Sequence, residues 1–587
     1  MFRALIRLVL LLGALSGSAA CIAGEDALFP GTGPLTWEDD PADRMVAGID
    51  RFLSAKWQAA PALRERYWEF DRSTSDAWRP AAERNRDRLK HILGMRDPRT
   101  ENPRLELNAT SRRPAVIART AKYWVQAVRW PAFADVHGEG LLLTPTGPIR
   151  AEVIAIPDAD TSPESLLGLV EGTAPESQFP RELAEQGCRV LVPALISRRR
   201  EKRNGRADLT DREYVYRSAF ELGRHLLGYE VLKVQAAVDA IRAERSETDR
   251  PLGVIGWGEG GLVALYAGAV DERLEAVAVS GAFGSLESTW SQPIDRNVFG
   301  LWERFGDAEL AALVYPRALE IEAARGPELV LEGNGGAPGE LATPALSRCR
   351  EELKRAGKIV PEQPRPQFRL SESGDGTGPF GSTEWLSRFL NALDLKEGGS
   401  KALQAILPES EAPSLHSEWP KEMALRSARQ LHELDRHNQQ VLRESPHVRE
   451  RFMAKLDTSS LDAYEASVEP YREVFARDVI GRWEDPRLAA NPRSRPFMET
   501  EAWRGYEVAL DVFPEVFAYG LLLVPKNLNE GERRPVVVCQ HGLEGRPITT
   551  VTGDNRSYHD FAARLCERRC IVFAPQNPYI FGDRFRT

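Results

Sequence analysis

Residues 253–261 read Gly-Val-Ile-Gly-Trp-Gly-Glu-Gly-Gly, the pattern of a nucleophile elbow with glycine in place of the serine. A Gly-x-Ser-x-Gly elbow is a strained strand-to-helix turn that presents a serine oxygen to an acyl carbon, and small residues must flank it. Gly256, Gly260 and Gly261 meet that need, but Gly258 at the serine position carries no oxygen. The segment therefore predicts the turn of an acyl hydrolase without its nucleophile.

Glu259 is the only reactive side chain in this turn, and it has two interpretations. A carboxylate can act as a nucleophile or as a general base. Alternatively, its role is structural, because the dipole and free N–H groups of a helix N-terminus attract an acidic side chain. We favour the structural interpretation.

A serine hydrolase of this type also needs an acid and then a histidine, in that chain order. Glu320 and Glu322 lie near the expected place of the acid, but no histidine occurs between His225 and His416. The loop where the histidine should stand, residues 372–378, reads Glu-Ser-Gly-Asp-Gly-Thr-Gly. Two independent losses predict that this half of the chain is catalytically inactive.

The chain repeats part of itself. Three blocks of the first half return in the second half in the same order: 140–145 as 520–525, 153–156 as 536–539, and 179–193 as 561–575. Repetition of this kind predicts two copies of one domain. In each copy, continuous apolar strands alternate with helical segments, which predicts a parallel sheet covered on both faces.

The expected organisation follows from the repeat. A helical stretch (41–93, and again 403–482) precedes an alternating hairpin in each copy (124–143, and again 506–523). We expect a signal peptide, a complete first domain, a linker and a second domain, at residues 1–24, 40–395, 396–402 and 403–587 respectively. The second copy is expected to be truncated after its fourth strand, before it reaches an elbow of its own.

The loop after the third strand of the second copy is the remaining catalytic candidate. In a serine hydrolase this loop supplies the second donor of the oxyanion hole. Here it contains His541, Gly542 and Leu543, whereas the first copy has Asp158 and Asp160, whose carboxylates would repel an oxyanion. The alternative is a purely structural loop, because a strand followed by His-Gly also occurs without function.

The N-terminus has the pattern of a secretory signal peptide. A basic flank, an apolar run from Leu8 to Leu15 and a group of small residues come before Cys21. The run is too short to span a bilayer comfortably, so we expect export to the periplasm or the medium and no integral membrane segment after cleavage. Lipid attachment at Cys21 is the alternative, disfavoured because Ser18 stands where such sites favour an aliphatic residue.

Composition excludes several other functions. The 86 acidic side chains outnumber the 77 basic ones, with no sustained basic face, which argues against a nucleic-acid partner. The cysteines after Cys21 are odd in number and lack zinc-ligand spacing. We expect no metal, no cofactor and no disulfide framework.

Four segments together resemble the two-domain bacterial α/β-hydrolase proteins described as acetyl xylan esterase-like or dienelactone hydrolase-like: residues 214–238, 253–280, 293–300 and 540–542. The resemblance implies a tandem α/β-hydrolase fold whose two domains pack together. It also implies an exported carboxylic ester hydrolase acting on acetylated polysaccharide, with Gly542 and Leu543 near the oxyanion. The competing hypothesis is a non-enzymatic protein that binds carbohydrate in the vacated first pocket.

Overall fold

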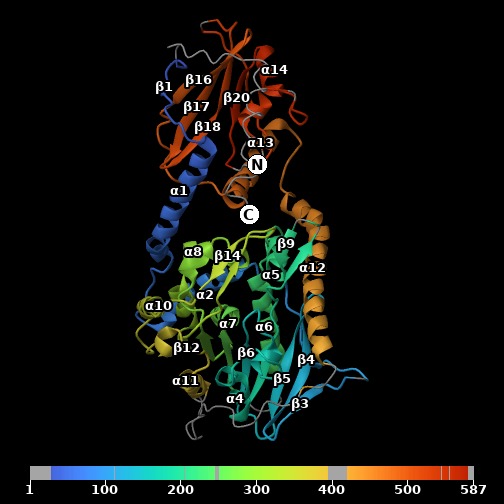
Figure 1. Ribbon diagram of the computed structural model, residues 1–587. Coiled ribbons are helices and arrows are strands. Elements are labelled where there is room, and N and C mark those ends of the chain that lie inside the picture. Colours follow the sequence, from blue (N-terminus) through green and yellow to red (C-terminus); the bar gives the residue numbers. More distant parts are fainter. Residues whose placement is uncertain are drawn as a thin grey trace, which may run out of the picture. The chain divides into compact units, whose positions relative to one another are not determined.

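The computed structural model describes residues 28–393 and 415–578, apart from 112, 204, 206, 245–249, 416–418, 530, 544 and 554 (Figure 1). The expected signal peptide with Cys21 and the expected linker at 396–402 lie outside the described residues. The described residues form two compact units, a smaller one that includes 28–58 and 468–578 and a larger one within Ala59–Ser467.

The larger unit is built on a ten-stranded sheet. Its strand order is β15 (Phe368–Glu372), β12 (Ala318–Ala323), β11 (Ala276–Ser280), β10 (Leu252–Trp257), β6 (Ala151–Ile156), β7 (Cys188–Pro193), β5 (Val136–Pro145), β4 (Tyr123–Phe133) and β2 (Glu106–Leu107), with β3 (Val116–Arg119) also paired to β4. The β4–β5 hairpin and the β5–β7 pair are antiparallel, and every pair from β7 to β15 is parallel. Numbered along the chain from β4, the main strands lie in the order 1-2-4-3-5-6-7-8, which is the α/β-hydrolase order.

Helices cover both faces of this sheet, as its parallel strands, most of which are buried, require. One face carries α2 (Ser75–Ile92), α6 (Leu226–Ala243), α7 (Glu259–Val270) and α9 (Asp307–Val314), and the other carries α4 (Phe179–Glu185) and α11 (Thr383–Leu393). Alternate residues of β6 point to the two cores, Ile154 and Ile156 to the first and Val153 and Ala155 to the second. The expected α/β class is confirmed.

The smaller unit contains a six-stranded sheet. Its order is β1 (Gly33–Pro34), β16 (Arg493–Glu499), β17 (Trp503–Phe513), β18 (Val516–Pro525), β20 (Ile571–Pro575) and β19 (Val536–Val538). The last four strands therefore follow the order of β4, β5, β7 and β6, with the same directions. The two hairpins even share an irregularity of register, between Pro131 and Phe133 in one and between Asp511 and Phe513 in the other.

Two long helices do not follow the succession expected from the sequence. The first part of α1 (Pro41–Arg64) belongs to the smaller unit and contacts the β17–β18 hairpin. In contrast, α12 (Trp419–Phe452) belongs to the larger unit and lies along β5 (Figure 1). The sequence predicts that each helix belongs to the same domain as the hairpin that follows it in the chain. Helical periodicity shows which face of a helix is buried, but not which sheet covers it.

The remaining helices are short or peripheral. They are α3 (Pro163–Leu166), α5 (Asp211–Phe220), α8 (Leu301–Arg304), α10 (Leu346–Ile359), α13 (Leu461–Val474) and α14 (Phe561–Glu567). Two small hairpins, β8–β9 (Arg200–Arg203 and Ala207–Thr210) and β13–β14 (Leu329–Leu331 and Gly339–Leu341), stand apart from the main sheets. Within the described residues, none of the helices combines the length and apolarity that a membrane crossing requires.

Candidate functional site

The turn between β10 and α7 has the backbone of an elbow. Gly258 has φ 61° and ψ −124°, a conformation that residues with a side chain rarely adopt. A Cβ on Gly256 would lie 2.2 Å from the carbonyl oxygen of Gly260, and one on Gly260 would lie 2.2 Å from that of Ile156. The glycines that suggested the motif are therefore required by close backbone packing.

The space beside Gly258 is filled. A Cβ at this position would lie 2.7 Å from Oδ1 of Asp158 and 3.0 Å from the ring of Pro327. The same Oδ1 accepts a hydrogen bond of 2.9 Å from the backbone N–H of Glu259. In serine hydrolases the N–H of the residue after the nucleophile is one of the two oxyanion donors. A carboxylate oxygen of the protein itself thus occupies that donor.

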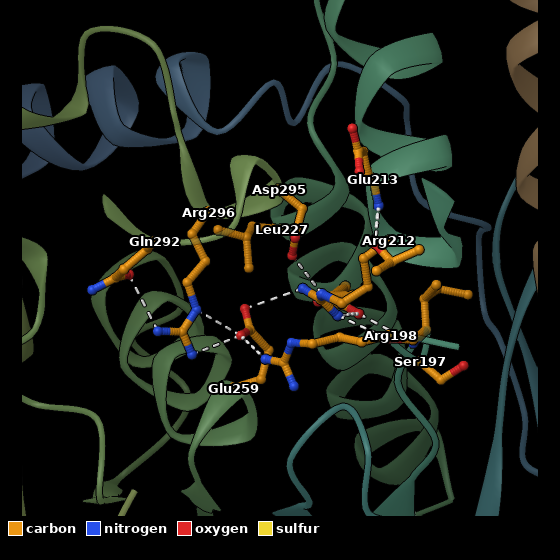
Figure 2. Close-up of polar contacts among 12 residues, drawn as sticks. Ser197, Arg198, Arg212, Glu213, Leu227, Glu259, Gln292, Asp295 and Arg296 are labelled. Atoms are coloured by element: carbon orange, nitrogen blue, oxygen red, sulfur yellow. Dashed lines mark hydrogen bonds and ion pairs between the residues drawn. The ribbon is translucent and has the colours of Figure 1, made fainter. Parts of the chain in front are cut away.

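Glu259 lies at the centre of three arginine side chains (Figure 2). Its Oε2 accepts from Nη2 of Arg198 at 2.7 Å and from Nε of Arg296 at 2.8 Å, and its Oε1 accepts from Nη2 of Arg212 at 3.1 Å. Glu259 is fully buried. Burial by itself would raise the pKa of Glu259, but the charges of Arg296, Arg212 and Arg198 hold it well below its ordinary value.

Two of the three arginines bind further acids, and the third, Arg296, donates to the side-chain oxygen of Gln292 at 3.2 Å. Arg198 also contacts Asp158 at 2.9 Å and Asp160 at 3.2 Å. Arg212 contacts Glu230 at 2.8 Å and Asp295 at 2.6 Å. Because its oxygens are directed at cations, Glu259 is suited neither to attack a carbonyl nor to take up a proton. The geometry favours the structural interpretation of this residue.

The place of the catalytic acid is also used structurally. Glu322, at the end of β12, accepts hydrogen bonds from the Ser280 hydroxyl at 2.5 Å and from the backbone N–H groups of Gly381 at 2.9 Å and Ser382 at 2.7 Å. It therefore holds the chain just before α11. The neighbouring Glu320 has a pKa raised to about 7, chiefly by burial.

No histidine of the described part of the larger unit takes the third place in a triad. The loop after β15 forms a short turn from Gly374 to Gly376. His225 instead caps α6, where its Nδ1 accepts from the Leu227 N–H at 3.1 Å. Burial lowers the pKa of His225 to about 4, so its ring is neutral at pH 7.

In the smaller unit, the His-Gly loop is held by its own neighbours. Nδ1 of the buried His541 lies 2.7 Å from the carbonyl oxygen of Gly542, and the N–H of Gly542 donates to the Tyr558 hydroxyl at 2.7 Å. The Leu543 side chain is 65% exposed. The expected oxyanion donor at Gly542 thus already faces an oxygen, that of a tyrosine.

In the ranges that the structure covers, no group of three or more His, Cys, Asp or Glu side chains is placed to hold a metal ion. Cys188, Cys349, Cys539, Cys566 and Cys570 are unpaired thiols, and only Cys570 is partly exposed. Burial raises the pKa of Cys188 to about 12, which leaves it a thiol at neutral pH.

Several site residues were not foreseen from the sequence. No sequence motif marks Arg198 or Arg212 as a functional residue. Arg296 lies in segment 293–300, which carries part of the family resemblance. They come from the loop after β7, from α5 and from a turn at Ile294–Arg296. These arginines differ from others in being buried although they are charged. The sequence does not reveal whether an arginine is buried.

No protein-family model matches the chain, and no curated protein has a significantly similar sequence. Similar solved structures include acetyl xylan esterase 1 of Thermoanaerobacterium sp. (12% identity, TM-score 0.35, covering 57% of this chain and 98% of that one). A glucuronoyl esterase of Solibacter usitatus is similar at 13% identity and TM-score 0.35, covering 55% and 94%.

Proposed function

We propose that the chain comes from an exported carboxylic ester hydrolase of the α/β-hydrolase class, and that its first domain, residues 40–395, is catalytically inactive. The observation that carries the proposal is the hydrogen bond from the Glu259 N–H to Asp158. This bond pairs one oxyanion donor with the permanent negative charge of Asp158. In a working site the same donor must be free to bind the negative charge that develops on the substrate. The substrate class we propose is an ester borne on a polysaccharide, as the resemblance to acetyl xylan esterase-like proteins implies.

The inactivity of the first domain has more than one cause. A serine at position 258 would meet Asp158 and Pro327, and the sequence has no histidine between His225 and His416 to take its proton. The glutamate at the acid position, Glu322, is already bound to three donors. A single substitution would therefore leave the domain inactive.

The test is an assay of the whole chain with an aryl acetate. We expect no hydrolysis above the uncatalysed rate. Saturable turnover that is lost in Glu259→Gln, while circular dichroism shows the fold retained, would overturn the proposal. Tyr558→Phe is the matched variant for the second domain, and loss of turnover there would place the activity at the His541–Gly542 loop instead.

We further propose that the esterase chemistry belongs to a second domain, of which residues 403–587 are the N-terminal part. Support comes from β19, whose Val536 and Val538 are 63% and 64% exposed, whereas its counterpart β6 is buried between β7 and β10. The coding sequence after Thr587 tests this point. A Gly-x-Ser-x-Gly within about 60 codons supports it, on the spacing usual for such folds. A stop codon or a second glycine at the serine position argues against it.

Carbohydrate binding without catalysis is the second candidate. Trp290 and Phe299, 57% and 70% exposed, flank the turn that carries Arg296. Exposed aromatic rings beside a degenerate site are suited to stacking on sugar rings. Titration with xylo-oligosaccharides should quench tryptophan fluorescence in the native chain but not in Trp290→Ala. An unchanged spectrum in the native chain would dismiss this candidate.

A further inference from the structure

We propose that the two copies exchange their leading helices. Helix α1 precedes the β4–β5 hairpin in the chain, but its first part lies on the β17–β18 hairpin. Helix α12 precedes the β17–β18 hairpin, but it lies on the β4–β5 hairpin (Figure 1). Each hairpin surface is therefore an interaction site for the helix of the other copy.

The contact of α12 with the first hairpin is detailed and polar. At the hairpin tip, Nε of Arg436 lies 2.6 Å from Oδ2 of Asp135. The ring of the adjacent His437 meets the ring of Phe133 edge to face, with centroids 5.2 Å apart. One turn earlier, Glu433 accepts from Arg129 at 2.5 Å.

The contact of α1 with the second hairpin uses corresponding positions. At that tip, Nη2 of Arg51 lies 2.6 Å from Oε2 of Glu515. The ring of the adjacent Phe52 stacks on Phe513, with centroids 5.5 Å apart. One turn earlier, Gly48 packs so closely that a Cβ there would lie 2.1 Å from the Glu515 carbonyl oxygen.

The two contacts share one register. On each helix an arginine is followed directly by a ring, Arg51–Phe52 on α1 and Arg436–His437 on α12. On each hairpin a phenylalanine beside the register irregularity lies two residues before the tip acid. Arginine meets acid and ring meets phenylalanine in both cases. The same contacts occur on both helices and on both hairpins. We therefore infer that α1 and α12 are equivalent helices bound at equivalent sites, each on the hairpin of the other copy.

A buried ion pair anchors α12 to the larger unit. Glu164, at the start of α3 and fully buried, accepts from Arg426 at 2.8 and 2.7 Å and from Nε1 of Trp419 at 2.7 Å. Without α12 this carboxylate would lose these three hydrogen bonds. Residues 419–452 thus complete the first domain, although they follow the expected linker.

The whole chain can be tested by cross-linking after cleavage within residues 396–402, where a specific protease sequence is introduced. The exchanged pairs are Asp135→Cys with Arg436→Cys and Arg51→Cys with Glu515→Cys. All four side chains are about half exposed, so the substitutions should leave the fold intact. We expect the shortest bismaleimide to join the two fragments in both exchanged pairs.

The unexchanged pairs are the matched controls: Arg51→Cys with Asp135→Cys, and Arg436→Cys with Glu515→Cys. Both cysteines of each control pair lie in one fragment, so a link between them is detected by mass spectrometry of proteolytic peptides. The chain without added cysteines controls for native thiols. Preferential linking of the unexchanged pairs would overturn the inference. It would equally be overturned if neither kind of pair links while the new thiols react with a monofunctional maleimide. The inference does not depend on enzymatic activity, so a failed esterase assay leaves it unaffected.

Discussion

The Oδ1 atom of Asp158 lies 2.9 Å from the backbone nitrogen of Glu259 and directly beside Gly258. This carboxylate takes the place that a substrate oxyanion would take in an active elbow. A charged acceptor on a buried N–H is a strong interaction, and Arg198 supports it from the other side at 2.9 Å. The elbow has therefore become a part of the core that holds the loop after β6 against α7.

Restoring the serine should destabilise the protein without restoring activity. In Gly258→Ser the new side chain must adopt a positive φ and displace Asp158 or Pro327. We expect the free energy of unfolding to fall by about 1–3 kcal/mol, the range for backbone strain and overpacking. Urea denaturation measures it. Gly357→Ser is the control, because a Cβ on Gly357 in α10 meets nothing within 4 Å, and an equal loss there would contradict the prediction.

Removing the charge of Glu259 should be far more damaging. Glu259→Gln leaves Arg198, Arg212 and Arg296 with less compensating charge in a buried site. We expect a loss of about 3–5 kcal/mol at pH 7, as for other broken buried ion pairs. The exposed Glu340→Gln on β14 should change the free energy of unfolding by less than about 0.5 kcal/mol. Comparable effects of the two variants would refute the argument.

The native chain and Glu259→Gln should also differ in how their stability depends on pH. The pKa of Glu259 is lowered in the folded state, so its contribution is fully present above the ordinary value of 4.5 and is lost as the pH falls below it. The difference in the free energy of unfolding between the native chain and Glu259→Gln should therefore be constant from pH 7 to about 5 and shrink below pH 4.5. If the difference in the free energy of unfolding grows on acidification, the pKa of Glu259 is raised in the folded state and not lowered.

Much of the larger sheet could be predicted because its strands are continuous apolar runs and its glycines mark close approaches. The elbow at Gly258 is of this kind, since sequence spacing alone encodes the turn. The charged cluster could not be predicted in the same way. Arg198, Arg212 and Arg296 are far apart in the chain, and their convergence on Glu259 depends on tertiary folding. The sequence predicts that Asp158 repels an oxyanion, but it does not reveal that the Oδ1 atom of Asp158 accepts the backbone N–H of Glu259.

The position of α12 illustrates a second limit. Its amphipathic pattern predicts a helix, and its place in the chain suggests a role in the second copy. The contacts of Arg426 and Trp419 with Glu164 place it on the first sheet instead. These partners are 255 and 262 residues apart in the chain, and local periodicity does not reveal them.

The anchor of α12 makes a quantitative prediction. Arg426→Ala should lower the free energy of unfolding of the larger unit by about 3–5 kcal/mol, because the buried Glu164 loses the cation bound to both of its oxygens. Arg436→Ala removes an exposed ion pair of the same helix and should cost less than about 1 kcal/mol. Hydrogen exchange of β5 and α12 measures both. A partial recovery in Arg426→Met with Glu164→Gln would confirm that the loss comes from the buried charge.

The free edge of β19 should control self-association. Val536 and Val538 are exposed on a strand that, among the residues the structure describes, pairs on one side only, with β20, and such edges recruit strands from other molecules. Val538→Lys should reduce aggregation, because a charged side chain on an edge strand disfavours further pairing. Val330→Lys, a substitution at a similarly exposed valine on β13, is the control for added charge. Light scattering against protein concentration should separate the two variants. If Val330→Lys improves solubility as much as Val538→Lys does, net charge and not the edge is responsible.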